Sequence, residues 1–138
     1  TGDNRTVQME AARAWATWEG STITLLPGPD ASSFTDPLFA LAFSRIENHY
    51  FTHDGFFEEG QLIREVHRLK GIPAVIVQGR YDICTPAASA WDLYQGWQTV
   101  DPAVELHWVG DAGHAFHEPG ILDQLIKTTD RFAANWAG

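Results

Sequence analysis

Asp82 and His114 are the two residues of this chain whose types and spacing most clearly suggest chemistry. Each follows a predicted strand, 74–77 in the case of Asp82 and 104–109 in the case of His114. A short apolar run such as 74–77 is typical of a strand that is covered on both faces in a parallel sheet. In open α/β sheets, ligands bind outside the carboxyl ends of the strands. Both side chains are therefore predicted to lie where reactions usually take place.

A carboxylate and an imidazole at such an edge suit nucleophilic catalysis. A serine hydroxyl is a poor nucleophile until an adjacent imidazole accepts its proton. That imidazole has to present the correct tautomer, and it passes through a cationic form that a buried carboxylate stabilises. In this interpretation Asp82 orients and stabilises the imidazole, and His114 acts first as base and then as acid.

The alternative is that these residues only shape turns, because Asp often follows a Gly-rich turn and Gly-His pairs are common in loops. Position alone does not separate the two interpretations. The separation of Asp82 and His114 along the chain fits one crossover between neighbouring parallel strands, which favours the catalytic interpretation.

The composition of the 138 residues is that of a folded protein with an acidic surface. Hydrophobic residues make up 44% of the chain, and the formal net charge is -9. That charge argues against nucleic acid and against an anionic membrane surface as partners, because both favour clustered lysine and arginine. No apolar run reaches the roughly 20 residues of a membrane helix, and 1–10 does not resemble a secretory signal. The single cysteine, Cys84, fits a reducing compartment, and we expect a cytoplasmic protein.

The elements that must position the Asp-His pair lie in the second half of the chain. Pro86 opens a predicted helix that ends near Trp97, and a last predicted helix covers 121–136. Together with the two strands, this gives the order strand, helix, strand, helix, which is typical of α/β architecture with a parallel sheet.

The first half of the chain is predicted to be helical, with helices at 7–18, 36–50 and 61–69. Gly20 is a plausible stop for the first helix, and Asp36-Pro37 a plausible start for the second. Pro27–Asp30 marks a loop. We expect residues 1–70 to form part of a helical cap domain and residues 71–138 to form part of an α/β core.

Four segments carry a family resemblance: IPAVIVQGRYD at 72–82, GDAGHAFHEP at 110–119, AFSRIENHYF at 42–51 and AWATWEG at 14–20. They resemble the proline iminopeptidases, which are serine exopeptidases that remove an N-terminal proline from peptides. The Gly-Arg-Tyr-Asp loop is fairly specific to that family, whereas the Gly-His loop is general to the α/β-hydrolase superfamily. The resemblance covers nearly the whole chain.

The resemblance implies the C-terminal part of an α/β-hydrolase, in which parallel strands and flanking helices follow helices of the cap domain. It implies Asp82 as the triad acid and His114 as the triad base, in agreement with the chain order Ser, Asp, His of that superfamily. Ala115, where family members often have serine, and the additional His117 are small departures. They leave the hydrogen bonding of this loop open. No cofactor is implied.

Glu19 and Glu47 correspond, by the same resemblance, to the two cap carboxylates that hold the free amino end of the substrate. The residue pattern gives independent support, because Glu47 extends a stripe of phenylalanines and Glu19 follows Trp15 by four residues. A carboxylate on an apolar stripe is costly unless its charge is compensated, and a bound ammonium group would do so. The alternative is a salt bridge to a neighbouring arginine, Arg13 or Arg45.

We predict no metal, because the remaining histidines lack metal-ligand spacing such as His-Glu-x-x-His. These histidines are His49, His53, His67, His107 and His117. His49 and Tyr50 are expected to pack, and Cys84 is expected to be a packed thiol near the site.

No serine lies in a Gly-x-Ser-x-Gly elbow; the serines are Ser21, Ser32, Ser33, Ser44 and Ser89. We expect the nucleophile to precede Thr1, and we expect residues 1–138 alone to be inactive. Two other functions remain open from the sequence. One is a different α/β-hydrolase, such as an esterase, or an epoxide hydrolase or dehalogenase with an Asp nucleophile, and the other is a non-catalytic module of the same fold.

Overall fold

The computed structural model describes residues 3–26 and 34–136, which form two compact units. The helical unit contains helix α1, Arg5–Thr22, helix α2, Pro37–Phe51, and the 3-10 turn η2, Asp54–Phe56. The sheet unit contains residues 23–25 and the chain from Gly60 onward. The predicted division into a cap and a core at residue 70 stays a prediction, because compactness alone does not define a cap domain. The loop predicted at Pro27–Asp30 lies outside the described residues.

Packing of α1 against α2 forms the helical unit. The residues that α1 buries are small and recur every four positions, namely Ala12, Ala16 and Gly20. Residues at this spacing share one face of a helix, so the two backbones can approach closely along that face. Ser44 of α2 uses this proximity, since its hydroxyl donates a hydrogen bond of 3.2 Å to the Ala12 carbonyl.

Of the two helix boundaries predicted in this unit, one is wrong and the other is confirmed. The prediction that Gly20 ends the first helix is wrong, because α1 continues to Thr22. A Cβ atom at Gly20 would lie 2.8 Å from Cγ of Phe34, so the glycine is explained by the close approach of an aromatic ring. The predicted start of α2 is confirmed: the Asp36 side chain accepts hydrogen bonds from two backbone N–H groups of the first turn, and Pro37 stands at the tolerated first position.

The sheet unit is built around two parallel strands, β1, Val75–Gly79, and β2, Glu105–Val109. They pair in register from Val75 opposite Glu105 to Gly79 opposite Val109. Its helical elements are α3, Gln61–Arg64, the 3-10 turn η3, Val66–Leu69, α4, Ala87–Gln98, and α5, Pro119–Trp136. No helix in the described ranges is long and apolar enough to span a membrane.

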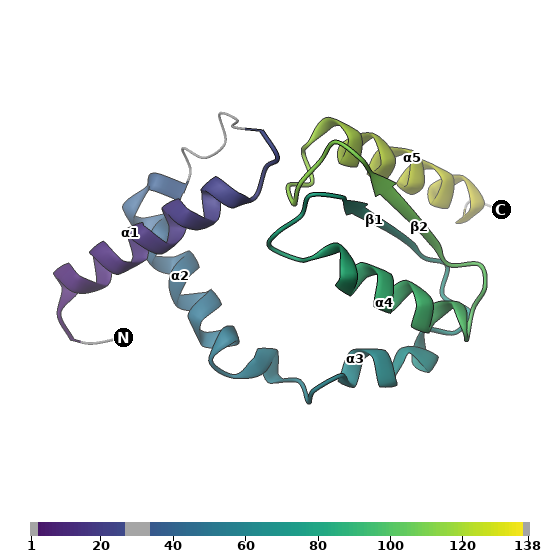
Figure 1. The fold of residues 1–138 in the computed structure, drawn as a ribbon, viewed down its shortest axis with the longest axis horizontal. Coiled ribbons are helices and arrows are strands. Elements are labelled where there is room, and N and C mark those ends of the chain that lie inside the picture. The colour runs from purple at the N-terminus through teal and green to yellow at the C-terminus, as the bar shows by residue number, and fades with distance from the viewer. Residues whose placement is uncertain (1–2, 27–33, 137–138) are drawn as a thin grey trace. The chain divides into compact units, whose positions relative to one another are not determined.

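Helices α4 and α5 cover opposite faces of the two strands (Figure 1). Consecutive strand residues point to opposite faces, and the two cores follow this rule. On one face Ile76 packs against a core that contains Trp97 of α4, and on the other Val77 packs against a core that contains Ile121 of α5. A two-stranded parallel sheet between helices is consistent with part of an α/β-hydrolase, as the sequence predicts.

Candidate active site

The loops that follow β1 and β2 are joined to each other at the carboxyl end of the sheet. Gly79 lies so close to the second loop that a Cβ atom would stand 1.8 Å from the Gly113 carbonyl oxygen. The N–H of Tyr81 donates a hydrogen bond of 3.0 Å to the carbonyl of Ala112. Only glycine permits this approach, and the approach brings the two loops to one place.

Asp82 and His114 meet at this edge, as their predicted positions after the strands require. His114 Nδ1 lies 3.0 Å from Asp82 Oδ2, which is hydrogen-bonding distance. The Asp82 side chain is buried, with 5% of it exposed, whereas 39% of the His114 side chain is exposed. A buried carboxylate thus faces one ring nitrogen of an accessible imidazole, which is the geometry that general base catalysis needs.

Several donors hold the Asp82 carboxylate in position. Oδ1 accepts hydrogen bonds from the backbone N–H groups of Cys84, at 3.0 Å, and Thr85, at 2.8 Å. Oδ2 accepts from the Thr85 hydroxyl at 2.7 Å and from Gln78 Nε2 at 3.1 Å, in addition to its contact with His114. The short chain segment after Asp82 therefore folds back over its own carboxylate, and the charge is satisfied by donors on both oxygens.

These contacts determine the charge of Asp82. Burial by itself raises the pKa of the carboxyl, but the hydrogen bonds from the Thr85 backbone, the Thr85 hydroxyl and His114 outweigh it and keep the pKa below its ordinary value. The carboxyl group is consequently ionised at neutral pH, so it can only accept hydrogen bonds.

A second carboxylate, Glu118, fixes the loop that carries His114. Glu118 Oε1 accepts a hydrogen bond of 2.7 Å from the N–H of Gly113, and Oε2 accepts one of 3.1 Å from the N–H of Leu25. The backbone N–H groups of His114 and Ala115 both donate to the carbonyl of Ile23, at 2.9 and 2.8 Å. Residues 23–25 therefore act as a strap that holds the His114 loop within the sheet unit.

Glu19 and Glu47 lie in the helical unit, on α1 and α2 respectively, and both are half-buried. Glu47 Oε2 accepts a hydrogen bond of 2.6 Å from the indole N–H of Trp15. Within the described residues this indole, and not Arg45, is the polar partner of Glu47. The prediction that Glu19 and Glu47 bind the same ligand stays a prediction.

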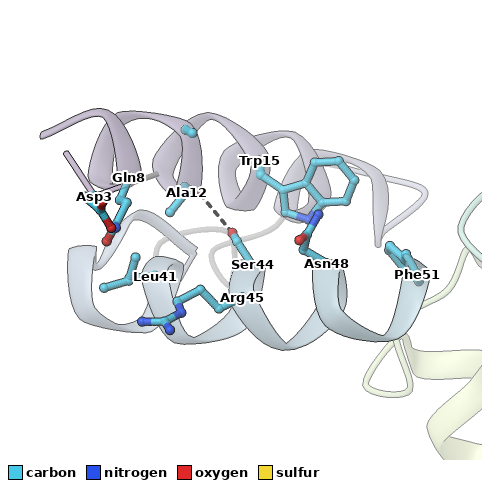
Figure 2. A pocket seen from close by; sticks show the side chains of 10 residues that line it. Asp3, Gln8, Ala12, Trp15, Leu41, Ser44, Arg45, Asn48 and Phe51 are labelled. Atoms are coloured by element: carbon cyan, nitrogen blue, oxygen red, sulfur yellow. Dashed lines mark hydrogen bonds between the residues drawn. The ribbon is translucent and has the colours of Figure 1, made fainter. Parts of the chain in front are cut away.

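A cavity of about 500 Å³ lies between α1 and α2 in the same unit. Figure 2 shows Trp15 of α1 standing over Asn48 of α2, with Phe51 further along α2. Arg45 also lines this cavity, on the stretch of α2 away from Phe51 (Figure 2). Glu47 is not among its lining residues, but Trp15, which donates to the Glu47 carboxylate, is one of them.

Comparison with known proteins finds relatives for nearly the whole chain. The chain is 47% identical over 135 residues to the proline iminopeptidase of Xanthomonas citri, which is 96% of this chain. The chain is homologous to proline iminopeptidases. Those of Arabidopsis thaliana and Neisseria gonorrhoeae are 44% and 38% identical to it, over 96% and 90% of the chain. No family model matches the chain.

The homologous region is only part of each proline iminopeptidase. The chain spans 42% of the length of the Xanthomonas citri protein and 34% of that of Arabidopsis thaliana. The resemblance stated from the four sequence segments is thereby confirmed, and the homologues are peptidases. The roles of single residues and the activity of a whole protein are not given by this comparison.

One group of side chains in the described part of this proline iminopeptidase homologue could hold a metal ion. Asp82, Cys84 and His114 each offer a ligand atom, and these atoms lie within 4.8 Å of one another. The spacing rules applied to the sequence do not detect this group, because its members come from two separate loops. His114 Nδ1 already lies within hydrogen-bonding distance of Asp82 Oδ2, so a metal at this nitrogen would have to replace that contact.

Sequence reasoning missed Gln78, Thr85 and Glu118, three polar residues that support the Asp-His pair. Gln78 is the one with a signal, because a glutamine at the end of an apolar strand is buried at a cost unless it is bonded. Thr85 and Glu118 have no such signal. Their types are ordinary for loops, and their partners become evident only when the loops are folded.

Proposed function

We propose that this chain supplies the acid and the base of a serine peptidase that releases N-terminal proline from peptides. The single observation that carries the proposal is the 3.0 Å contact between Asp82 Oδ2 and His114 Nδ1 at the carboxyl end of the sheet. Homology to proline iminopeptidases over 96% of the chain supports the choice of substrate.

In the proposed mechanism His114 Nδ1 keeps its hydrogen bond to Asp82, which leaves Nε2 as the base. A serine contributed by a part of the protein outside this sequence loses its proton to Nε2 as its oxygen attacks the carbonyl of the proline residue. Asp82 stabilises the imidazolium ion that forms. His114 then gives the proton to the departing amine as the peptide bond breaks, which leaves the prolyl group as an ester on the serine. A water molecule that gives its proton to Nε2 attacks this ester, and His114 returns the proton to the serine oxygen as proline is released.

Glu19 and Glu47 bind the secondary ammonium group of the N-terminal proline in this proposal. The Trp15 indole donates to one oxygen of Glu47, which fixes the direction of the carboxylate and leaves the other oxygen for the substrate. Because a free amino end is required, the enzyme is an exopeptidase. No metal or cofactor takes part, and the protein works in the cytoplasm.

The test uses the full-length protein that contains this chain, with proline p-nitroanilide and its N-acetyl derivative as substrates. We expect hydrolysis of the free amine and a rate about a hundredfold or more lower for the acetylated compound, because the charge-assisted hydrogen bonds to the glutamates are lost. Equal rates on both compounds, or activity only on a neutral ester, would assign the chain to another kind of α/β-hydrolase.

The same assay is then applied to residues 1–138 alone. We expect no hydrolysis by the isolated chain and recovery of activity on mixing with the remainder of the protein. Hydrolysis by the isolated chain would require a nucleophile among its own residues and would contradict the proposed division of the triad.

A further inference from the structure

Thr85 stands at the contact between Asp82 and His114 in a way that the proposed function does not use. Its Oγ1 lies 2.7 Å from Asp82 Oδ2 and 3.2 Å from His114 Nδ1. The three atoms therefore form a triangle, since Oδ2 and Nδ1 are themselves 3.0 Å apart. A hydroxyl in such a triangle bonds to both members of the pair.

The direction of these hydrogen bonds follows from counting protons. A threonine hydroxyl has one proton to donate and lone pairs that accept, and an ionised carboxylate only accepts. The short contact of 2.7 Å with Oδ2 therefore takes the Thr85 proton. What Oγ1 then turns toward Nδ1 is a lone pair.

His114 Nδ1 is consequently faced by two acceptors, Asp82 Oδ2 and Thr85 Oγ1. This arrangement is favourable only when Nδ1 carries a proton. A neutral imidazole has one N–H, so Nε2 is then the bare nitrogen and the base. If the Thr85 proton instead pointed to Nδ1, the ring would be held in the opposite, unproductive tautomer.

The backbone around Thr85 holds its hydroxyl in this place. The Thr85 N–H donates to Asp82 Oδ1 at 2.8 Å, and the Thr85 carbonyl accepts from Gln78 Nε2 at 3.1 Å. Gln78 is buried and also donates to Asp82 Oδ2 at 3.1 Å. Thr85 is therefore hydrogen-bonded through its N–H, its carbonyl and its hydroxyl. Gln78 holds both the Thr85 carbonyl and the Asp82 carboxylate.

We infer that Thr85 is a positioning residue that acts with Asp82 to fix the tautomer of His114, with its proton on Nδ1 and Nε2 free to act as base. The inference rests on the proposed acid-base role of His114 and adds a residue to it. Thr85 acts through His114 and Asp82 and does not touch the substrate.

The primary test is Thr85→Val in the full-length protein, which removes the hydroxyl and keeps the shape of the side chain. Loss of one hydrogen bond to a charged group should lower kcat/KM for proline p-nitroanilide about ten- to a hundredfold, mainly through kcat. Thr85→Ser keeps the hydroxyl and should restore most of the activity. Thr99→Val is the matched control, because its hydroxyl bonds a helix carbonyl, that of Gly96, away from the pair.

The second readout is ¹⁵N NMR of histidine-labelled protein, in which protonated and bare ring nitrogens have separate resonances. His114→Gln assigns the signals of His114 by their loss. The unaltered protein should show Nδ1 protonated and Nε2 bare. Thr85→Val keeps the Asp82 contact with Nδ1 but loses the second acceptor, so it should show a measurable population of the other tautomer. Thr85→Ala, which adds no second methyl group, replaces Thr85→Val if the latter does not fold.

Unchanged tautomer and unchanged kcat/KM in the hydroxyl-free variants would overturn the inference. So would a loss of activity that Thr85→Ser fails to restore, because the effect would then not depend on the hydroxyl. The NMR readout needs no substrate. A protein that shows the tautomer change but does not cleave proline p-nitroanilide would retain the role of Thr85 and contradict the proposed function instead.

Discussion

The two units of this chain hold their carboxylates in opposite ways. Asp82, in the sheet unit, is buried and accepts hydrogen bonds on both oxygens from backbone, hydroxyl, amide and imidazole groups. Glu47, in the helical unit, is half-buried, and its polar partner among the described residues is the single indole N–H of Trp15. The first carboxylate is committed to the protein itself, whereas the second retains lone pairs for another donor.

The difference fits the two roles proposed above, an orienting carboxylate at Asp82 and a ligand-binding carboxylate at Glu47. An orienting group must not move or change its charge, so its donors are many and come from the adjacent loop. A ligand-binding group must exchange partners, so it is fixed by few donors. Changes at Asp82 are therefore expected to affect every substrate, and changes at Glu47 only substrates with a free amine.

The largest expected effect is that of Asp82→Asn. The amide can donate a proton toward His114 Nδ1 and so favour the unproductive tautomer, and we expect kcat to fall by about four orders of magnitude on any substrate. The measurement is kcat of the full-length variant on proline p-nitroanilide and on a neutral ester. Asp123→Asn, at an exposed salt bridge with Lys127, is the control and should behave like the unaltered protein.

The next largest effect is expected for Gly79→Ala, which tests whether the joined loops are needed. The added Cβ would clash with the Gly113 carbonyl oxygen, so we expect a loss of at least about 3 kcal/mol in the free energy of unfolding. Urea unfolding of the full-length protein measures it. Gly110→Ala is the control, because a Cβ there meets no atom within 4 Å, and equal losses in the two variants would contradict this account of the loops.

Glu47→Gln and Glu19→Gln should have smaller and selective effects. Each should lower kcat/KM about ten- to a hundredfold on substrates with a free N-terminal proline, since a charge-assisted hydrogen bond is worth about 1.5–3 kcal/mol. A neutral ester should be hydrolysed as before. Glu65→Gln, at an exposed contact with Arg68, is the control. An equal loss on amine and ester would give these glutamates a structural role and remove the contrast with Asp82.

The smallest effect concerns Glu105, an exposed carboxylate at the start of β2. Hydrogen bonds from His107 and then from Arg131 lower the pKa of Glu105 below its ordinary value. A lowered pKa stabilises the fold above the pKa of the unfolded chain, and this contribution is lost as the pH falls through the folded pKa. Because the pair is exposed, Glu105→Gln should cost no more than about 1 kcal/mol at pH 7.

Urea unfolding of the unaltered protein and of Glu105→Gln, at neutral and at acidic pH, checks this value. The difference in the free energy of unfolding between the two proteins should shrink as the pH falls below the ordinary pKa of a glutamate. It should also shrink when salt is added. A larger loss of unfolding free energy in Glu105→Gln at neutral pH, or a loss that persists in acid, would show that an exposed carboxylate is held as firmly as Asp82.

The sequence was sufficient for the parts of the fold that depend on periodicity. The strand before Asp82, the proline that precedes α4 and the capped start of α2 were all predicted close to their observed positions. The meeting of Asp82 and His114 followed from one rule, that the carboxyl ends of neighbouring parallel strands share an edge.

The sequence was not sufficient where a residue's role depends on a distant partner. Glu118 bonds the N–H of Leu25, and nothing in either residue type indicates that contact. Gly20 was assigned to a helix end because glycine is common there, yet its place is explained by the ring of Phe34. Thr85 is an ordinary loop residue until the second loop brings His114 beside it.

The most direct test of the central claim is the turnover of His114→Ala in the full-length protein on proline p-nitroanilide. In the proposed mechanism, His114 is the group through which Asp82, Thr85 and the serine all act. We predict that kcat falls by several orders of magnitude while KM changes little, because the base is removed and the binding groups remain. Near-normal turnover by this variant would contradict the assignment of Asp82 and His114 as the acid-base pair.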